Sequence, residues 1–175
     1  MAAFAAGGIL TAAGLIRTLP FGLIKQADES VNNSTTVQGD DELNVPVAAN
    51  TTYKIDAHIL ATDGTGTSMD LKVAWTQPSG SILSLAVVGP HTAWNASSGA
   101  LEVEWNGWQN DTGTLTATRS FGSSNSGTFS YHFRGTISVG STAGFFRLQW
   151  AQNTATVGNL TVKAGSSLIL TPILA

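Results

Sequence analysis

The chain has 175 residues, a length typical of one domain, and only 11% of them are charged, with a net charge of −3. No basic patch is evident, so the composition excludes a typical nucleic-acid-binding protein. The lack of cysteine excludes a disulfide scaffold and thiolate metal sites. The 19 glycines and the many threonine, serine and asparagine residues favour strands and tight turns over helices.

The first 24 residues, MAAFAAGGILTAAGLIRTLPFGLI, are almost entirely small and apolar. They lack the basic start of a signal peptide, and Arg17, Pro20 and several glycines interrupt them as a membrane-spanning helix. Residues 2–19 can form one short amphipathic helix that ends at Pro20. We predict that residues 1–25 are an apolar arm that docks onto another protein or a sister subunit, with membrane contact or processing as alternatives. The side chains expected to dock are Phe4, Ile9, Leu10, Leu15, Ile16, Leu19, Phe21, Leu23 and Ile24.

Residues 26–41 are polar and rich in turn residues, and they predict a linker with one short strand at residues 35–38. In residues 42–175, apolar and polar residues alternate in short runs that Gly, Ser and Asn turns separate. The expected strands cover residues 43–47, 53–59, 69–75, 82–88, 100–105, 114–121, 129–139, 146–151, 160–162 and 168–173. Because no helical period and no Gly-rich phosphate loop occur in this body, a doubly wound α/β fold is excluded. We therefore predict an all-β protein, an antiparallel β-sandwich or jelly-roll-like body of about eight to ten strands.

Three tryptophans, Trp94, Trp105 and Trp108, lie in or beside a predicted loop at residues 89–99. Aromatic residues near loops are favoured at protein interfaces and at carbohydrate-binding faces. These tryptophans are therefore candidates for surface recognition, including glycan binding. The alternative is that they close one end of the sandwich, because large apolar side chains are the first to be buried.

Few residues suggest chemistry. Glu102 and Glu104 lie two apart on a predicted strand, as glycosidase carboxylates can, but glutamates on the wet face of a strand need no function. The acidic turn at residues 40–42 lacks the spacing of a calcium-binding loop. His58 and His132 fall at outward positions of different strands, and no third residue completes a zinc site. We therefore predict no catalytic residue, no metal site and no cofactor, and hence a protein that is not an enzyme.

Three runs of the sequence are distinctive together: KQADESVNNSTTVQGDDELNVPVAANTTYKIDAHI, DLKVAWTQPSG and FRGTISVGSTAGFFRLQWAQNTATVGNLTVKAGSSLIL. They resemble a β-domain of virion structural proteins from tailed bacteriophages, especially those of actinobacteria. The resemblance is carried by Lys25–Asp28, Asp40–Leu43 with Val47–Tyr53, Arg134–Thr136 and Gly144–Gln152, and it covers residues 25–170. It implies a non-enzymatic, multimeric component of a phage particle. The apolar arm lies outside the resemblance.

A chain of this size with one β-body and an arm suits a capsid decoration protein better than a shell-forming capsid protein. The expected partner is the major capsid protein, and the expected location is the capsid surface or the tail of a virion, with no membrane and no nucleic acid bound. We expect a homotrimer, because Ala74, Phe145 and Ala151 fall on nominally polar strand faces and invite a neighbour. One alternative is a minor tail or tail-fibre protein with a receptor- or glycan-binding role. Another is a carbohydrate-active enzyme that uses Glu102 and Glu104, and a third, on composition alone, is a non-viral secreted adhesion module.

Overall fold

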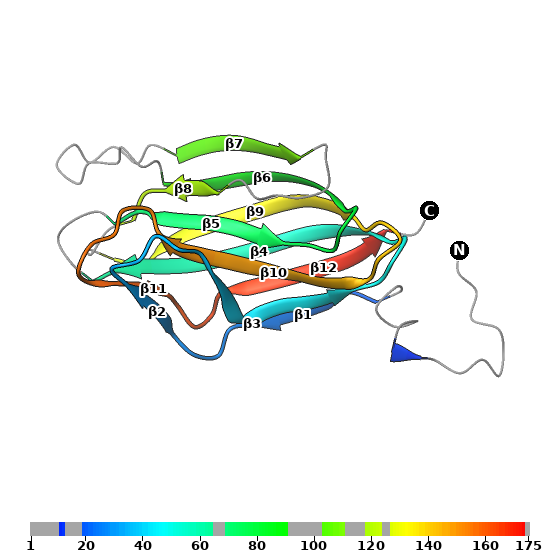
Figure 1. The fold of residues 1–175 in the computed structure, drawn as a ribbon, viewed down its shortest axis with the longest axis horizontal. Coiled ribbons are helices and arrows are strands. Elements are labelled where there is room, and N and C mark those ends of the chain that lie inside the picture. Colours follow the sequence, from blue (N-terminus) through cyan, green and yellow to red (C-terminus); the bar gives the residue numbers. More distant parts are fainter. Residues whose placement is uncertain are drawn as a thin grey trace.

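The computed structural model describes residues 11–12, 19–64, 69–90, 103–110, 118–123 and 127–173, with the backbone alone for 103–110. These residues contain twelve β-strands, which lie in two layers (Figure 1). The strands are β1 (Phe21–Ile24), β2 (Glu29–Asn32), β3 (Gln38–Val47), β4 (Thr52–Asp63), β5 (Leu71–Thr76), β6 (Ile82–Pro90), β7 (Val103–Asn110), β8 (Arg119–Phe121), β9 (Phe129–Ser138), β10 (Gly144–Gln152), β11 (Asn159–Val162) and β12 (Ser167–Ile173).

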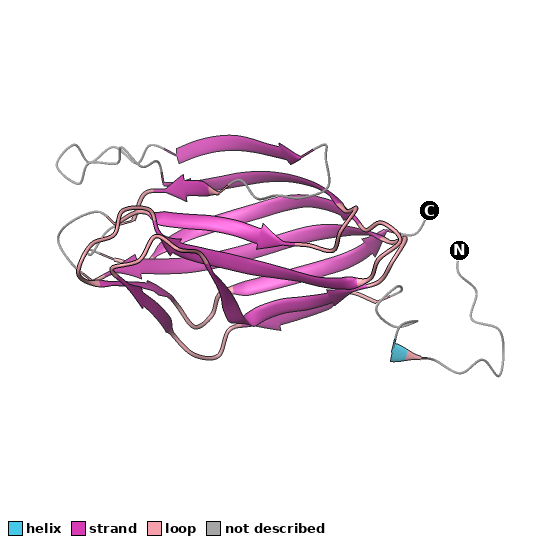
Figure 2. Ribbon diagram, in the orientation of Figure 1, coloured by secondary structure: helices cyan, strands magenta, loops and turns pink. Residues whose placement is uncertain are grey.

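Two antiparallel sheets form the body. The larger sheet has eight strands in the order β1-β12-β4-β9-β6-β7, with β11 pairing β4 and β2 pairing β11. The smaller sheet has four strands in the order β3-β10-β5-β8. Figure 2 shows the two layers facing each other, joined by loops. The predicted all-β antiparallel sandwich is confirmed, although twelve strands exceed the expected number of about eight to ten.

The strand pairs are nested. β3 pairs with β10, β4 with β9, β5 with β8 and β6 with β7. The chain from β3 to β10 therefore follows one long hairpin whose two halves are wound across both sheets. This is the connectivity of a jelly-roll-like body, in which every inner strand is paired on both sides.

Alternating side chains on the inner faces of both sheets form one core. In β4, every second residue from Tyr53 to Ala61 is buried, as period-two patterning requires. Trp75 of the smaller sheet stacks on Phe146 with ring centroids 4.8 Å apart, and it meets Phe133 of the larger sheet edge-on at 5.4 Å. Such close-packed interiors resist deformation, so the body behaves as a rigid block.

The sheets begin earlier in the chain than the sequence suggested. Phe21–Ile24 lie inside the expected arm but form β1, which pairs with β12. Residues 26–41, the expected linker, contain β2 and the start of β3. Strands of four residues carry too short an alternation to be recognised from sequence. The helix expected over residues 2–19 falls almost wholly outside the described residues.

The three apolar residues expected to be exposed on polar strand faces behave differently from one another. Ala74 and Ala151 are buried, with exposed fractions of 3% and 0%, so the chain itself covers them. Phe145 is exposed, as expected. Two of the three positions therefore give no support to a subunit contact on this sheet.

Candidate docking surface

Strand β1 lies at an edge of the larger sheet. It pairs with β12 on one side, and no described strand pairs with its other side. An edge strand presents unpaired N–H and C=O groups, to which a segment of another chain can add as a further strand. This unpaired edge lies beside β3 of the smaller sheet, and it is also the place where the apolar N-terminal sequence enters the body.

Exposed apolar side chains surround this strand. Their register explains the grouping: Gly22 lies opposite Ile169 and Ile24 lies opposite Ser167, so the two isoleucines are diagonal neighbours on the outer face. Ile24 is 61% exposed and Ile169 is 41% exposed. We use the term apolar edge for the set of exposed residues on and beside β1 and on β12: Leu19, Phe21, Ile24, Ile169 and Ile173. Ile24, Ile169 and Ile173 share the outer face of the sheet, whereas Phe21 lies opposite the buried Leu170 and therefore belongs to the other face of β1. Scattered single apolar residues are normal on a surface, but a cluster indicates an interaction site.

The apolar edge only partly matches the sequence prediction. Leu19, Phe21 and Ile24 were expected to dock and are exposed here, whereas Leu23 is half-buried and packs against the core. Sequence reasoning missed Ile169 and Ile173. Their signal was the nearly continuous apolar run of β12, which leaves apolar side chains on both faces of the strand. Phe4, Ile9, Leu10, Leu15 and Ile16 lie outside the described residues.

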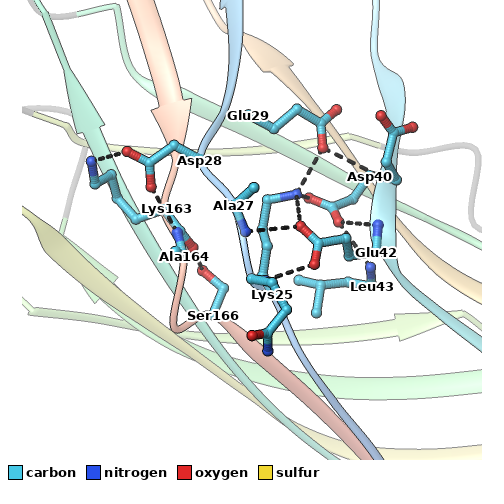
Figure 3. Close-up of polar contacts among 12 residues, drawn as sticks. Lys25, Ala27, Asp28, Glu29, Asp40, Glu42, Leu43, Lys163, Ala164 and Ser166 are labelled. Carbon is cyan, nitrogen blue, oxygen red and sulfur yellow. Dashed lines mark hydrogen bonds and ion pairs between the residues drawn. The ribbon is translucent and has the colours of Figure 1, made fainter.

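Lys25 fastens the end of β1 to the body. Its backbone N–H donates to the Ser166 carbonyl at 2.8 Å, and its carbonyl accepts from the Gly165 N–H at 2.9 Å. Its side chain is buried, with Nζ 2.8 Å from Glu29 Oε2 and 3.0 Å from Asp40 Oδ2 (Figure 3). Burial alone would lower the pKa of Lys25, but its hydrogen bonds and charge interactions with the two carboxylates outweigh burial and raise the pKa. The ammonium group therefore stays charged inside the protein.

Two further carboxylates hold the segment that follows. Glu42 accepts the backbone N–H groups of Gln26 at 2.6 Å and Ala27 at 3.1 Å, and these bonds lower the pKa of its carboxyl. Asp28 accepts from the Lys163 ammonium and from the Ala164 N–H, and both interactions lower its pKa (Figure 3). We call residues 25–28 with these contacts the clamp. Because it engages both β3 and the β11–β12 loop, it fixes β1 to both layers.

The clamp also decides the role of the acidic turn at residues 40–42. Asp40 is fully buried, and its Oδ1 accepts the backbone N–H groups of Glu42 and Leu43 at 3.0 and 2.8 Å. Its Oδ2 pairs with Lys25. The Asp40 and Glu42 carboxylates are therefore occupied by Lys25 and by backbone donors, whereas Asp41 is exposed and lies near Arg147. In the part of the chain that the structure describes, no group of three or more His, Asp or Glu residues is placed to hold a metal ion.

The tryptophan prediction stays untested. Trp94 lies outside the described residues. Trp105 and Trp108 belong to β7, where their backbones pair opposite Val88 and Leu85, and their side chains are not among those described. Among the residues that the structure describes, no helix is long and apolar enough to cross a bilayer.

Comparisons with known proteins add little to this geometry. No protein-family model matches the chain, and no curated protein matches it. Among solved structures, the infectious bursal disease virus Gt strain is similar over 90% of this chain and 43% of its own, with 9% identity and a TM-score of 0.22. The VP2 subviral particle of the same virus matches over 88% and 41%, with 11% identity and a TM-score of 0.21. The chain spans less than half of either protein, and likenesses at these TM-scores carry no argument about function.

Proposed function

We propose that this chain is a non-enzymatic structural protein of a tailed-bacteriophage virion, and specifically a capsid decoration protein that docks on the major capsid lattice and stabilises it. The observation that carries the proposal is the apolar edge. It lies on an unpaired edge strand, directly after the apolar N-terminal sequence, and its exposed isoleucines need a partner surface to cover them.

Two further features support this function. The sequence resemblance to phage virion β-domains runs through the clamp residues Lys25–Asp28 and Asp40–Leu43, which are the residues that fix the edge strand to the body. The tightly packed sandwich supplies a rigid block, so load on the edge strand is passed to both sheets. A docking protein needs both a firm attachment and a stiff body.

The proposal includes assembly. A sister subunit of a homotrimer or a capsid subunit would cover the apolar edge, and several edges in one oligomer would bind the lattice together. Each further contact forms at high effective concentration once the first is made, so weak single contacts add up to stable attachment.

Co-sedimentation with purified capsids tests the docking function. Ile24→Asp and Ile169→Asp place a charge in the proposed contact, and each should weaken capsid binding by about tenfold or more because the carboxylate would be desolvated there. Val157→Asp is the matched control, because Val157 is 76% exposed in the loop between β10 and β11. Equal capsid binding by all three variants would contradict the proposal, as would full binding by a chain that lacks residues 1–18.

The second candidate is a minor tail or tail-fibre protein that recognises a receptor or glycan. The aromatic segment around Trp94, Trp105 and Trp108 favours it, since such residues stack on sugars. Glycan binding that disappears in Trp94→Ala, together with no affinity for capsids, would favour this candidate over decoration.

A further inference from the structure

The outer face of the larger sheet carries a polar cluster at its centre, on two neighbouring rows of paired residues. In one row, Asp56 of β4 lies opposite Arg134 of β9, which lies opposite Ala86 of β6. In the next row, His58 lies opposite His132. All are outward positions, because the residues that alternate with them form the core. Neither the apolar edge nor the clamp uses this cluster.

A hollow of about 280 Å³ opens beside the cluster and is lined by Ala86, Val88, His132 and Arg134. Its position follows from residue size. Ala86 is small, and Gly107, which pairs with it from β7, has no side chain. The sheet surface is therefore recessed at Ala86, beside the longer side chains of Val88, His132 and Arg134. The hollow is slightly smaller than the pockets of about 300–1,000 Å³ that hold drug-sized ligands. It therefore suits a smaller ligand, with a single ring.

The charge of this face is opposite in sign to that of the whole chain. The protein has a net charge of −3, yet the face carries Lys54, Arg134 and two histidines. Asp56 is the single acidic side chain that the described strands place there. Its Oδ2 is 3.6 Å from Arg134 Nε, which is too long for a hydrogen bond, and the Arg134 side chain is 69% exposed. The guanidinium therefore keeps its donors available to a ligand.

Two histidine rings lie side by side on this face. Their rings stack with centroids 4.4 Å apart at an angle of 11°, and His58 Nε2 lies 3.2 Å from Ser130 Oγ. Burial lowers the pKa of His58, and the nearby His132 lowers it further, while Asp56 opposes them. A lowered pKa favours the neutral ring, and a neutral imidazole still has one N–H group that can donate a hydrogen bond to an anion.

We propose that this hollow binds an acidic monosaccharide unit, a sugar ring that bears one carboxylate. The carboxylate pairs with the Arg134 guanidinium, whose planar fork matches it, and with the His132 imidazole. The C–H face of the ring lies against Ala86 and Val88. In the next row, Ser84 lies opposite Thr136, and their hydroxyl groups can exchange hydrogen bonds with ring hydroxyls.

The proposed sugar site is separate from the proposed docking surface. Ile169 of the apolar edge lies in the same row as Ala86, with β4 and β9 between their strands, which is a separation of about 14 Å at about 4.8 Å per strand. A partner that covers the apolar edge can therefore leave the hollow open. A docked subunit would then present a sugar-binding face.

The test is a titration of the full chain with D-glucuronate, D-galacturonate and N-acetylneuraminate, followed by NMR of the imidazole signals. D-glucose supplies the ring without the charge, and acetate supplies the charge without the ring. At least one acidic sugar should bind saturably, and both partial probes should bind about tenfold more weakly or worse. No saturable binding by any acidic sugar would overturn the proposal. Acetate binding as tight as the best sugar would also overturn it, by reducing the site to an anion patch.

Variants separate charge from shape. Arg134→Gln should weaken the best sugar by about tenfold, and Arg134→Lys should restore part of the loss. Arg119→Gln is the matched control, because Arg119 is an exposed arginine on β8 of the other sheet. Ala86→Leu should fill the hollow and abolish sugar binding without changing the charge. Sugar affinity unchanged in both Arg134→Gln and Ala86→Leu would contradict the site. Capsid binding, measured on the same variants, reports separately on the docking function.

Discussion

Replacing Lys25 with methionine removes one buried ammonium group while nearly preserving side-chain length. The Nζ atom lies 2.8 Å from Glu29 and 3.0 Å from Asp40, and Asp40 has no solvent exposure. Glu29 is partly exposed and can be rehydrated, whereas Asp40 would remain as a buried carboxylate without a cation. Removing one partner of a buried ion pair costs about 3–5 kcal/mol, so we expect Lys25→Met to lower the free energy of unfolding by that amount. This is a large part of the total stability of a typical domain, about 5–15 kcal/mol.

Urea unfolding of the wild type, Lys25→Met and the double variant Lys25→Met with Asp40→Asn measures this cost. The amide introduced by Asp40→Asn would keep a side-chain oxygen as acceptor for the Leu43 N–H without a buried charge, so the double variant should regain at least about half of the loss. A loss below about 1 kcal/mol in the single variant would refute the reasoning, because it would place the ion pair among ordinary surface pairs. A double variant no more stable than Lys25→Met would refute it as well.

Three other expectations follow from particular contacts. Gly135→Ala would drive a new Cβ into the backbone of β6 and should cost at least about 1–3 kcal/mol by urea unfolding, while Gly127→Ala, which meets nothing within 4 Å, should be nearly neutral; equal costs would contradict the packing. Burial raises the pKa of Asp63, so its contribution to stability falls as pH rises through that pKa; Asp63→Asn should therefore gain stability relative to wild type as pH rises above about 4, and a constant difference would contradict this. The hydrogen bonds from Lys163 and Ala164 lower the pKa of Asp28, so the stability that Asp28 contributes is present above its unfolded pKa and is lost as pH falls through its folded pKa. Over that pH range, the protection of the Ala164 amide against hydrogen exchange, relative to its intrinsic exchange rate at each pH, should fall. A protection factor that does not change with pH would count against the clamp.

The sandwich could be predicted because long strands carry a readable alternation. Tyr53, Ile55, Ala57 and Ile59 face the core as their spacing required, and all four are buried. The extra strands at the start of the chain could not be predicted, because β1 and β2 have four residues each. They become strands through partners far along the chain, β12 and β11. Tertiary pairing decides the structure of such short segments.

The candidate docking surface was predictable only in its first half. Composition identified Leu19, Phe21 and Ile24, but it could not separate Ile24 from Leu23, because only the register of β1 against β12 decides which of these two side chains reaches the core. The buried ion pairs of Lys25 could not be predicted from the sequence either. Its carboxylate partners stood in what looked like a solvated linker, and burial of a lysine depends on a fold that brings them around it.

The position of this chain on the intact virion, from a cryo-electron microscopy reconstruction, tests the central claim most directly. The account predicts density for the β-sandwich on the capsid surface, with Ile24 and Ile169 covered by a capsid subunit or by a sister copy. Density in the tail, or an apolar edge that faces solvent on the assembled particle, would contradict it.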